Sequence, residues 1–142
     1  MQLNMSLNAF LDLPVAEKVP LVEDYAVLYA QQYNRADLDY FCKLADGARM
    51  LHKRAKGADL MASLLRHRLA LNFFVQPSSR TFLSFSAAQS MLGMKRMSVR
   101  DINISSMSKG ESLVDSVRTF ISYVDLVVQR HGDEFAGAVA YW

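Results

Sequence analysis

The chain has 142 residues, 51% of them apolar and 21% charged, and 16 basic residues against 14 acidic ones leave a formal net charge of +2. This length fits one domain, and the composition excludes a disordered, collagen-like or low-complexity chain. No apolar run approaches the roughly 18 to 20 residues that cross a bilayer, and residues 1–10 lack the basic start and continuous apolar stretch of a secretory signal. We therefore expect no membrane association and no export.

A single cysteine, Cys42, excludes an internal disulfide and a thiolate metal cage. We expect a reducing compartment, the cytoplasm, and no bound metal. The basic residues gather in short clusters within 49–68 and at Lys95 and Arg96, without interleaved aromatic residues. Such clusters are typical of solvated faces, so nucleic-acid binding is the least favoured hypothesis.

Residues 1–34 are interpreted as an N-terminal extension, punctuated by Pro14 and Pro20. The apolar spacing between Leu21 and Gln32 predicts one short helix within it. Because that helix has one apolar face, the face must dock on something, and its function is not readable from the sequence.

The rest of the chain, residues 35–142, is expected to be one domain. Helical spacing from Asp37 predicts an amphipathic helix that ends near Gly57, with Cys42 in it as a small core or boundary residue. Strands predicted at 69–75, 97–104 and 125–129 alternate with helices predicted at 78–92, 111–123 and from 135 onward. This alternation predicts an α/β fold: a three-layer, mostly parallel sheet with helices on both faces.

Hydroxyl and cationic side chains follow each predicted strand. Ser78 to Thr81 follow the first strand, Ser105 to Glu111 the second, and Arg130 with His131 the third. In parallel sheets, ligands bind beyond the carboxyl ends of the strands, where helix N-termini present free N–H groups. We therefore expect Arg80, Lys109 and Arg130 to converge on one anion.

Each of these motifs also has a purely structural interpretation. Ser78 is suited to cap its helix, and Ser108 with Glu111 matches a capping box. Arg130 can be an ordinary surface arginine, and His131 a hydrogen-bonded loop histidine. Taken together on one edge of the sheet, the same residues favour an anion site.

Three stretches of the chain resemble signature motifs of the aspartate and ornithine carbamoyltransferase family. Phe73 to Phe85 resembles F-F-E-x-S-T-R-T-R-x-S-F, Ser105 to Ser112 resembles S-x-x-x-K-G-E-[ST], and Asp115 to His131 resembles D-T-x-x-x-x-x-Y-x-D-x-x-x-x-R-H. The match runs in register over residues 36–135, and the combination is far more specific than any of its parts. The K-G-E loop resembles the aspartate branch more than the ornithine branch.

This resemblance implies a carbamoyl-phosphate-binding domain. In the family, an amino acid's amine attacks the carbamoyl carbon of carbamoyl phosphate and phosphate leaves, without a metal or organic cofactor; with aspartate as acceptor this belongs to pyrimidine biosynthesis. The resemblance assigns catalysis to Arg80, Thr81 and Arg130. It assigns the binding of carbamoyl phosphate to Ser78, Ser79, Arg80, Thr81, Arg130 and His131. Ser105 and Lys109 match positions that enter the neighbouring subunit's site, so the resemblance implies a homotrimer and allows a larger assembly with other pyrimidine-pathway chains.

The chain departs from the family pattern at several positions of the motifs. Ser79 stands where the family usually has threonine, and Phe82 stands where it has an arginine, which removes a cation. Val75 and Gln76 change the usual acidic residue before the loop, and Gly132 replaces the proline that commonly follows Arg-His.

The largest departure is at the end of the chain, where neither the family's H-P-T-Q stretch nor its amino-acid-binding second domain is found. We therefore expect a carbamoyl-phosphate-binding domain that is incomplete at its C-terminal end and has little or no turnover by itself. The alternative is a non-catalytic, carbamoyltransferase-like module that serves trimerisation or partner docking.

Overall fold

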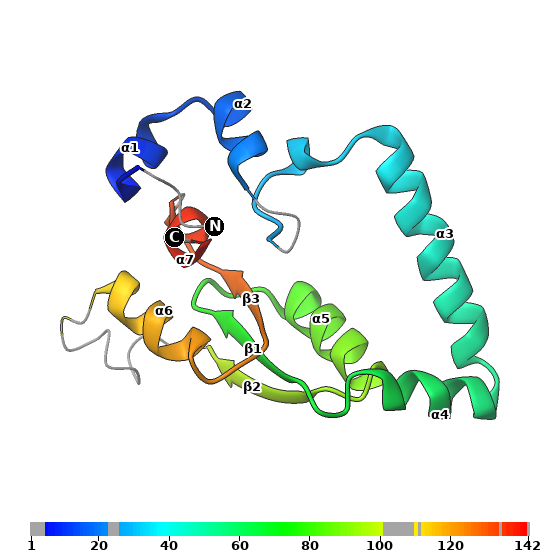
Figure 1. Ribbon diagram of the computed structural model, residues 1–142. Coiled ribbons are helices and arrows are strands. Elements are labelled where there is room, and N and C mark those ends of the chain that lie inside the picture. The colour runs from blue at the N-terminus through cyan, green and yellow to red at the C-terminus, as the bar shows by residue number, and fades with distance from the viewer. Residues whose placement is uncertain (1–4, 23–25, 101–109, 111, 134, 142) are drawn as a thin grey trace.

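The computed structural model describes residues 5–22, 26–100, 110, 112–133 and 135–141 (Figure 1). The strands are β1 (Leu69–Phe74), β2 (Lys95–Val99) and β3 (Leu126–Arg130). The helical elements are α1 (Leu7–Asp12), α2 (Val15–Lys18), η1 (Val19–Leu21), η2 (Ala30–Gln32), α3 (Arg35–His52), α4 (Ala55–Leu64), α5 (Ser79–Met91), α6 (Leu113–Ile121) and α7 (Ala136–Tyr141).

The three strands form one parallel sheet in the order β2-β1-β3. Strand β1 lies in the centre because its run LALNFF is apolar at both alternating sets of positions, as a strand covered on both faces requires. All its residues after Leu69 are buried. The predicted α/β fold with a parallel sheet is confirmed.

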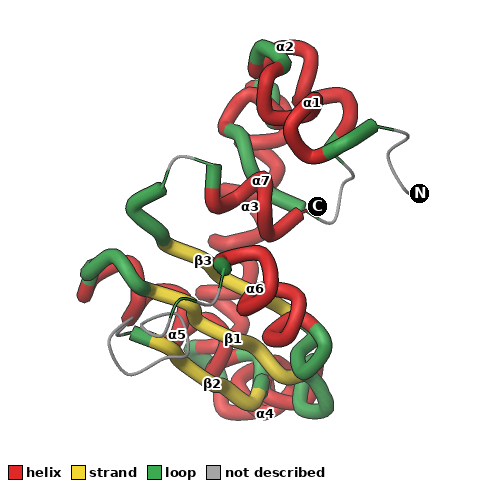
Figure 2. Tube along the Cα trace, turned by 90° about the vertical axis from the view of Figure 1, so that its left-hand side faces the viewer, coloured by secondary structure: helices red, strands yellow, loops and turns green. Residues whose placement is uncertain are grey.

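Helices cover the sheet on both faces, α6 on one and α5 on the other (Figure 2). Leu71 and Phe73 pack with Val117 of α6, and the Phe73 ring lies 5.5 Å from that of Phe120. The next residue along β1, Phe74, points to the other face and meets Phe82 of α5 edge-on at 5.4 Å. Side chains therefore alternate between the two helical layers along β1.

A buried polar network fixes α5 on β1. The Asn72 amide donates to Gln89 Oε1 at 2.8 Å and to Ser86 Oγ at 3.2 Å, and Gln89 Nε2 donates back to Asn72 Oδ1 at 3.0 Å. All three residues are buried, where amide groups need such partners. The network sets how far along the strand the helix sits, and hence where the first turn of α5 lies relative to the end of β1.

The prediction of a single helix from Asp37 to Gly57 is wrong, because α3 ends at His52 and α4 begins at Ala55. The Asn34 side chain starts α3 by accepting from Ala36 N and Asp37 N. Gly57 lies inside α4 rather than after a helix. A Cβ there would be 2.1 Å from the Leu51 carbonyl oxygen, so glycine is needed where the two helices cross.

The predicted helix between Leu21 and Gln32 is also wrong. The described part of this segment holds two short turns, η1 and η2, while Tyr25, one of the residues in the apolar spacing, lies outside the described residues. Gln32 keeps residues 26–29 extended: its Oε1 accepts from Leu28 N at 2.7 Å and Tyr29 N at 2.8 Å, and its Nε2 donates to Ala26 O at 2.8 Å. These bonds take the place of helical ones.

The N-terminal segment packs on the end of the chain. Phe10, which is fully buried, forms a cluster with Val22 and with Ala138 of α7. The Tyr141 hydroxyl also donates to Leu21 O at 3.1 Å. The first and last described helices therefore share one small apolar core, set apart from the one between β1 and α6.

The remaining predicted boundaries shift by a few residues. Strand β2 begins at Lys95 rather than 97, and residues 101–104 of the predicted strand lie outside the described residues. Helix α6 begins at Leu113, where Ser112 Oγ accepts from Asp115 N at 3.1 Å. The predicted capping box of Ser108 and Glu111 lies outside the described residues.

An acidic residue joins the amino ends of β1 and β3. Asp125 accepts a hydrogen bond from Leu69 N at 2.8 Å and another from Arg68 Nη1 at 2.6 Å. The backbone bond, followed by the Arg68 bond, lowers the pKa of Asp125 below its ordinary value of 3.8. Because the unfolded carboxyl group binds protons more readily, this group stabilises the fold above that ordinary value and stops doing so as the pH falls through the lower, folded pKa.

We accordingly expect Asp125→Asn to lower the melting temperature at neutral pH, and the difference from the wild type to shrink as the pH falls below about 4. Thermal unfolding followed across pH 2–7 measures this. Asp59→Asn is the matched control, since Asp59 is exposed on α4 and its carboxylate has no hydrogen bond or ion pair with another described residue. A difference between wild type and Asp125→Asn that stays constant across that range would contradict the expectation.

Candidate functional site

The carboxyl ends of β1 and β3 lie side by side and are joined by backbone hydrogen bonds. Phe74, the last residue of β1, is in register with Arg130, the last residue of β3. Beyond the strands, Val75 N and Gln76 N both donate to the Arg130 carbonyl oxygen, at 3.1 and 3.3 Å. These bonds hold the turn between β1 and α5 against the end of β3. We call this end of the sheet the carboxyl edge.

The first turn of α5 presents donors at the carboxyl edge. Ser78 occupies the N-cap position, as the structural interpretation expected, but its side chain caps no backbone N–H. It donates instead to Thr81 Oγ1 at 3.0 Å. The Thr81 hydroxyl accepts this bond and keeps its own proton for another acceptor. The backbone N–H groups of Ser79, Arg80 and Thr81 precede the first helical bond, from Phe82 N to Ser78 O, and remain available to an anion.

Two of the predicted arginines belong to this edge. Arg130 shares the row of Phe74, whose ring faces α5, so the Arg130 side chain leaves the sheet on the α5 face. Its Nε is buried and has no hydrogen-bond partner among the described residues. Arg80, in the first turn of α5, is exposed, and no hydrogen bond or ion pair with another described residue involves its guanidinium. A buried guanidinium donor without a partner is what an anion would satisfy.

His131 lies apart from these arginines. Its ring is 6.4 Å from that of Phe73, on the side of the sheet that α6 covers. Its Nδ1 accepts from Asp133 N at 3.0 Å, which holds the ring in the turn after β3. Nε2 is the ring nitrogen left for another partner.

A third arginine that the sequence analysis did not select stands at the same edge. The Arg100 guanidinium lies over the Phe82 ring, with its carbon 4.4 Å from the ring centroid. Phe82 is the position where the family motif has an arginine. Sequence spacing gave no signal for Arg100, because its contact with the Phe82 ring joins two separate segments of the chain. Ser105 and Lys109, the predicted contribution of the second loop, lie outside the described residues.

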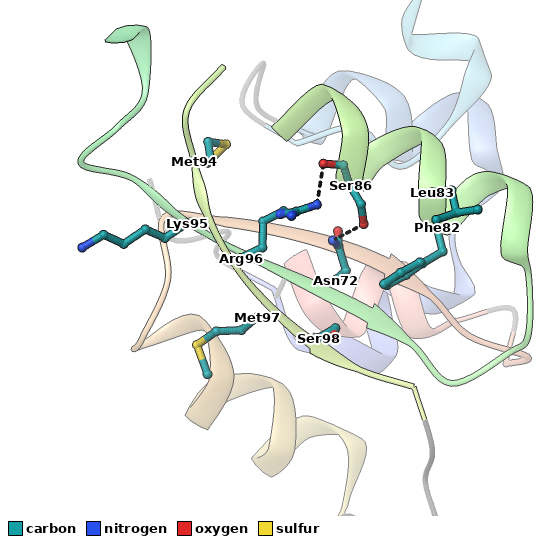
Figure 3. Close-up of a pocket in the computed structure, with 9 residues that line it drawn as sticks. All are labelled: Asn72, Phe82, Leu83, Ser86, Met94, Lys95, Arg96, Met97 and Ser98. Atoms are coloured by element: carbon teal, nitrogen blue, oxygen red, sulfur yellow. Dashed lines mark hydrogen bonds between the residues drawn. The ribbon is translucent and has the colours of Figure 1, made fainter. Parts of the chain in front are cut away.

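The space beside these residues is a hollow of about 670 Å³ between α5 and β2 (Figure 3). Phe82 lies over the strands at one end of it, and Lys95 points away at the other. Arg96 reaches across to donate to the Ser86 carbonyl oxygen at 2.8 Å. None of the predicted site residues lines this hollow, so it adjoins the candidate site without forming it.

Metal clusters and membrane-spanning helices are absent from the part of the chain that the structure describes. No group of three or more His, Cys, Asp or Glu side chains there could hold a metal ion. Over the same residues, none of the helices combines the length and the hydropathy needed to span a bilayer.

Comparison with known proteins identifies the sequence over most of its length. Residues 26–141 match the family described as aspartate/ornithine carbamoyltransferase, carbamoyl-P binding domain. The aspartate carbamoyltransferase catalytic subunit of Thermoplasma acidophilum is 36% identical over 120 residues, which are 84% of this chain and 38% of that protein. The multifunctional protein pyr-3 of Neurospora crassa is 39% identical over 114 residues, 80% of this chain and 6% of that protein.

Solved structures agree with this assignment. Aspartate transcarbamoylase from Trypanosoma cruzi, crystallised in complex with carbamoyl phosphate and aspartate, superposes with a TM-score of 0.71 and 34% identity. The match covers 82% of this chain and 35% of that one. The catalytic subunit of M. jannaschii aspartate transcarbamoylase gives a TM-score of 0.64 at 30% identity, over 82% of this chain and 37% of that one. The chain thus spans well under half the length of these relatives.

Proposed function

The chain belongs to the aspartate/ornithine carbamoyltransferase family, and we propose that its carboxyl edge binds the phosphate group of carbamoyl phosphate as part of an aspartate-type carbamoyltransferase. The observation that carries this proposal is the buried Arg130 Nε, which has no partner among the described residues and stands beside the uncapped first turn of α5. A phosphate oxygen supplies the acceptor that this donor needs.

In this proposal each residue of the edge has a defined role. The first-turn N–H groups and the side chains of Ser79 and Arg80 hold the phosphate. Ser78, whose hydroxyl proton goes to Thr81 Oγ1, orients the Thr81 hydroxyl. Thr81 directs its free hydroxyl proton at the carbamoyl oxygen, and Arg130 spans the carbamoyl oxygen and the phosphate. The binding role of His131 stays a prediction from the family motif: its ring lies on the α6 side of the sheet, and only Nε2 is left for a ligand because the Asp133 N–H engages Nδ1.

The reaction follows from these positions. The aspartate amine attacks the carbamoyl carbon and a C–N bond forms. The bond from carbon to the phosphate oxygen breaks, and the amine proton passes to the departing phosphate. Negative charge grows on the carbamoyl oxygen and the departing phosphate. Arg80, Thr81 and Arg130 stabilise that charge and are the proposed catalytic residues.

We further propose that the chain assembles as a homotrimer in the cytoplasm, in which Ser105 and Lys109 of one subunit enter the site of the next. This proposal rests on the family motif, because both residues lie outside the described part of the structure. The similarity to a multifunctional protein supports a larger assembly with other pyrimidine-pathway chains. The mass of the protein in solution distinguishes a trimer from a monomer.

A non-catalytic scaffold is the second candidate function. Phe82 favours it, because an aromatic ring packed on Phe74 occupies the position of a family cation. A scaffold would keep the fold and the subunit contacts without needing an anion at the carboxyl edge.

Calorimetric titration with inorganic phosphate and with carbamoyl phosphate separates the two candidates. We expect the wild type to bind both ligands and Arg80→Ala to bind them about 10- to 100-fold more weakly, as the loss of a charged hydrogen bond of about 1.5–3 kcal/mol implies. Arg54→Ala, an exposed arginine between α3 and α4, is the control and should match the wild type. A polypeptide of these 142 residues is expected to form carbamoyl aspartate at little more than background rate. Equal heats for wild type and Arg80→Ala would leave the scaffold.

A further inference from the structure

Arg100 is held at the carboxyl edge by an aromatic stack. Its guanidinium lies 4.4 Å above the centroid of Phe82, and Phe82 is itself fixed edge-on against Phe74 at 5.4 Å. Val99 is in register with Phe73, so Arg100 follows at the level of Phe74. Arg130 is in register with Phe74 on the other side. Arg100, Phe74 and Arg130 therefore form one row across the three strands, which we call the arginine row.

The arginine row faces the first turn of α5. Phe74 and Phe82 touch, and Phe82 directly follows Thr81 in that helix. Arg100 thus reaches the start of α5 from the β2 side, while Arg130 reaches the same face from the β3 side. One arginine therefore lies at this edge for each strand. Arg80 is in the first turn of α5, which follows β1, Arg100 follows β2, and Arg130 ends β3.

We propose that Arg100 is a third phosphate-binding arginine of the site, standing in for the arginine that the family motif places at position 82. The inference rests on the proposed function, because it assigns one more residue to the same anion. It goes beyond that function in naming a residue that the family motifs do not include.

The stacked geometry suits this role. A guanidinium that lies over a ring uses its face for the cation–π contact and keeps the N–H groups at its perimeter free to donate. Arg100 is exposed and has no carboxylate partner among the described residues. Arg96, four residues earlier on the same strand, is in contrast bound to the Ser86 carbonyl oxygen. Because the ring already orders the Arg100 side chain, little further ordering is needed when an anion binds.

Phosphate titration at low ionic strength, with the full chain, tests the inference. We expect Arg100→Ala to weaken the binding of inorganic phosphate by about 10-fold. Phe82→Leu keeps the charge and removes the ring, and we expect a smaller loss, because the guanidinium is no longer held in place. Lys95→Ala, the same change of charge at the amino end of the same strand, is the matched control and should bind like the wild type.

A compensating exchange distinguishes phosphate binding from a merely structural contact. In the Arg100→Ala background, Phe82→Arg restores the family's arrangement and should recover most of the lost affinity. Circular dichroism shows whether this double variant folds. If it does not, the phosphate affinities of the single variants Arg100→Ala and Phe82→Leu decide whether Arg100 binds phosphate. If Arg100→Ala bound phosphate as tightly as the wild type, or if Lys95→Ala lost as much affinity as Arg100→Ala, the role of Arg100 would be overturned. The proposed function would still stand. A wild type that binds no phosphate would overturn the proposed function, and with it this inference.

Discussion

Arg130→Ala is expected to abolish measurable phosphate binding without destabilising the fold. The variant removes a guanidinium from the centre of the proposed site, so we expect a loss of about 100-fold or more, at the upper end of the range for charged hydrogen bonds. It also removes a buried Nε that has no partner among the described residues. Leaving such a donor unpaired costs about 1–3 kcal/mol, so the melting temperature of the variant should be equal to or above that of the wild type.

Opposite changes in affinity and stability are what identify a binding group. Replacing an arginine that served only the structure would lower the melting temperature and leave the affinity for phosphate unchanged. Arg130→Lys is the informative second variant, because it keeps the charge but loses the fork of donors, and it should bind phosphate with intermediate affinity. Calorimetry and thermal unfolding of the same samples measure both quantities. A drop in melting temperature together with unchanged affinity would contradict the assignment of Arg130.

Gly93→Ala is expected to destabilise the protein by about 2–5 kcal/mol. Gly93 follows α5 with φ of +82°, a conformation that costs an alanine about 1–2 kcal/mol. A Cβ at this position would also stand 1.9 Å from the Ala62 carbonyl oxygen of α4. Relieving that overlap moves backbone, and overpacking of this kind costs about 1–3 kcal/mol. Denaturant unfolding measures the sum.

Three other glycines separate the two contributions. Gly110 has φ of +92° and open space around it, so its alanine variant should show the conformational cost alone. Gly57 has the close approach to Leu51 O without a positive φ, and its variant should show the overlap alone. Gly47, in the middle of α3, has neither, and Gly47→Ala should stabilise by about 0.5–1 kcal/mol. Equal effects at Gly93 and Gly47 would contradict this account.

The sheet and its covering helices were predictable from local sequence, from apolar runs in the strands and helical spacing between them. The run from Leu69 to Phe74 could be assigned as a buried central strand because it is apolar at every position but Asn72. Gly57 misled the analysis for a physical reason, since a glycine demanded by a helix crossing looks in sequence like one that ends a helix. The helix predicted between Leu21 and Gln32 was wrong for another reason. The Gln32 side chain makes hydrogen bonds that replace helical ones in residues 26–32, and the spacing of apolar residues does not show such bonds.

The candidate site was likewise predictable from the sequence only in part. That Ser78, Arg80 and Arg130 share one edge followed from the rule that parallel strands end together, and the structure places them there. That Arg130 and His131 leave the sheet on opposite faces needed the register of β3 against β1. Arg100 was missed because its significance depends on the Phe82 ring beneath it, a contact between segments that no spacing reveals.

The small core shared by the first and last helices has a consequence for how the chain reaches its fold. Phe10 is enclosed by Ala138 and its neighbours, so the two ends of the polypeptide must meet before that ring is sheltered from water. A ribosome releases residue 138 long after residue 10, and until then this core lacks the side chains that α7 contributes. Docking of residues 5–22 should therefore be among the last events of folding, slower than formation of local helices, because closing so long a loop carries a large entropic penalty.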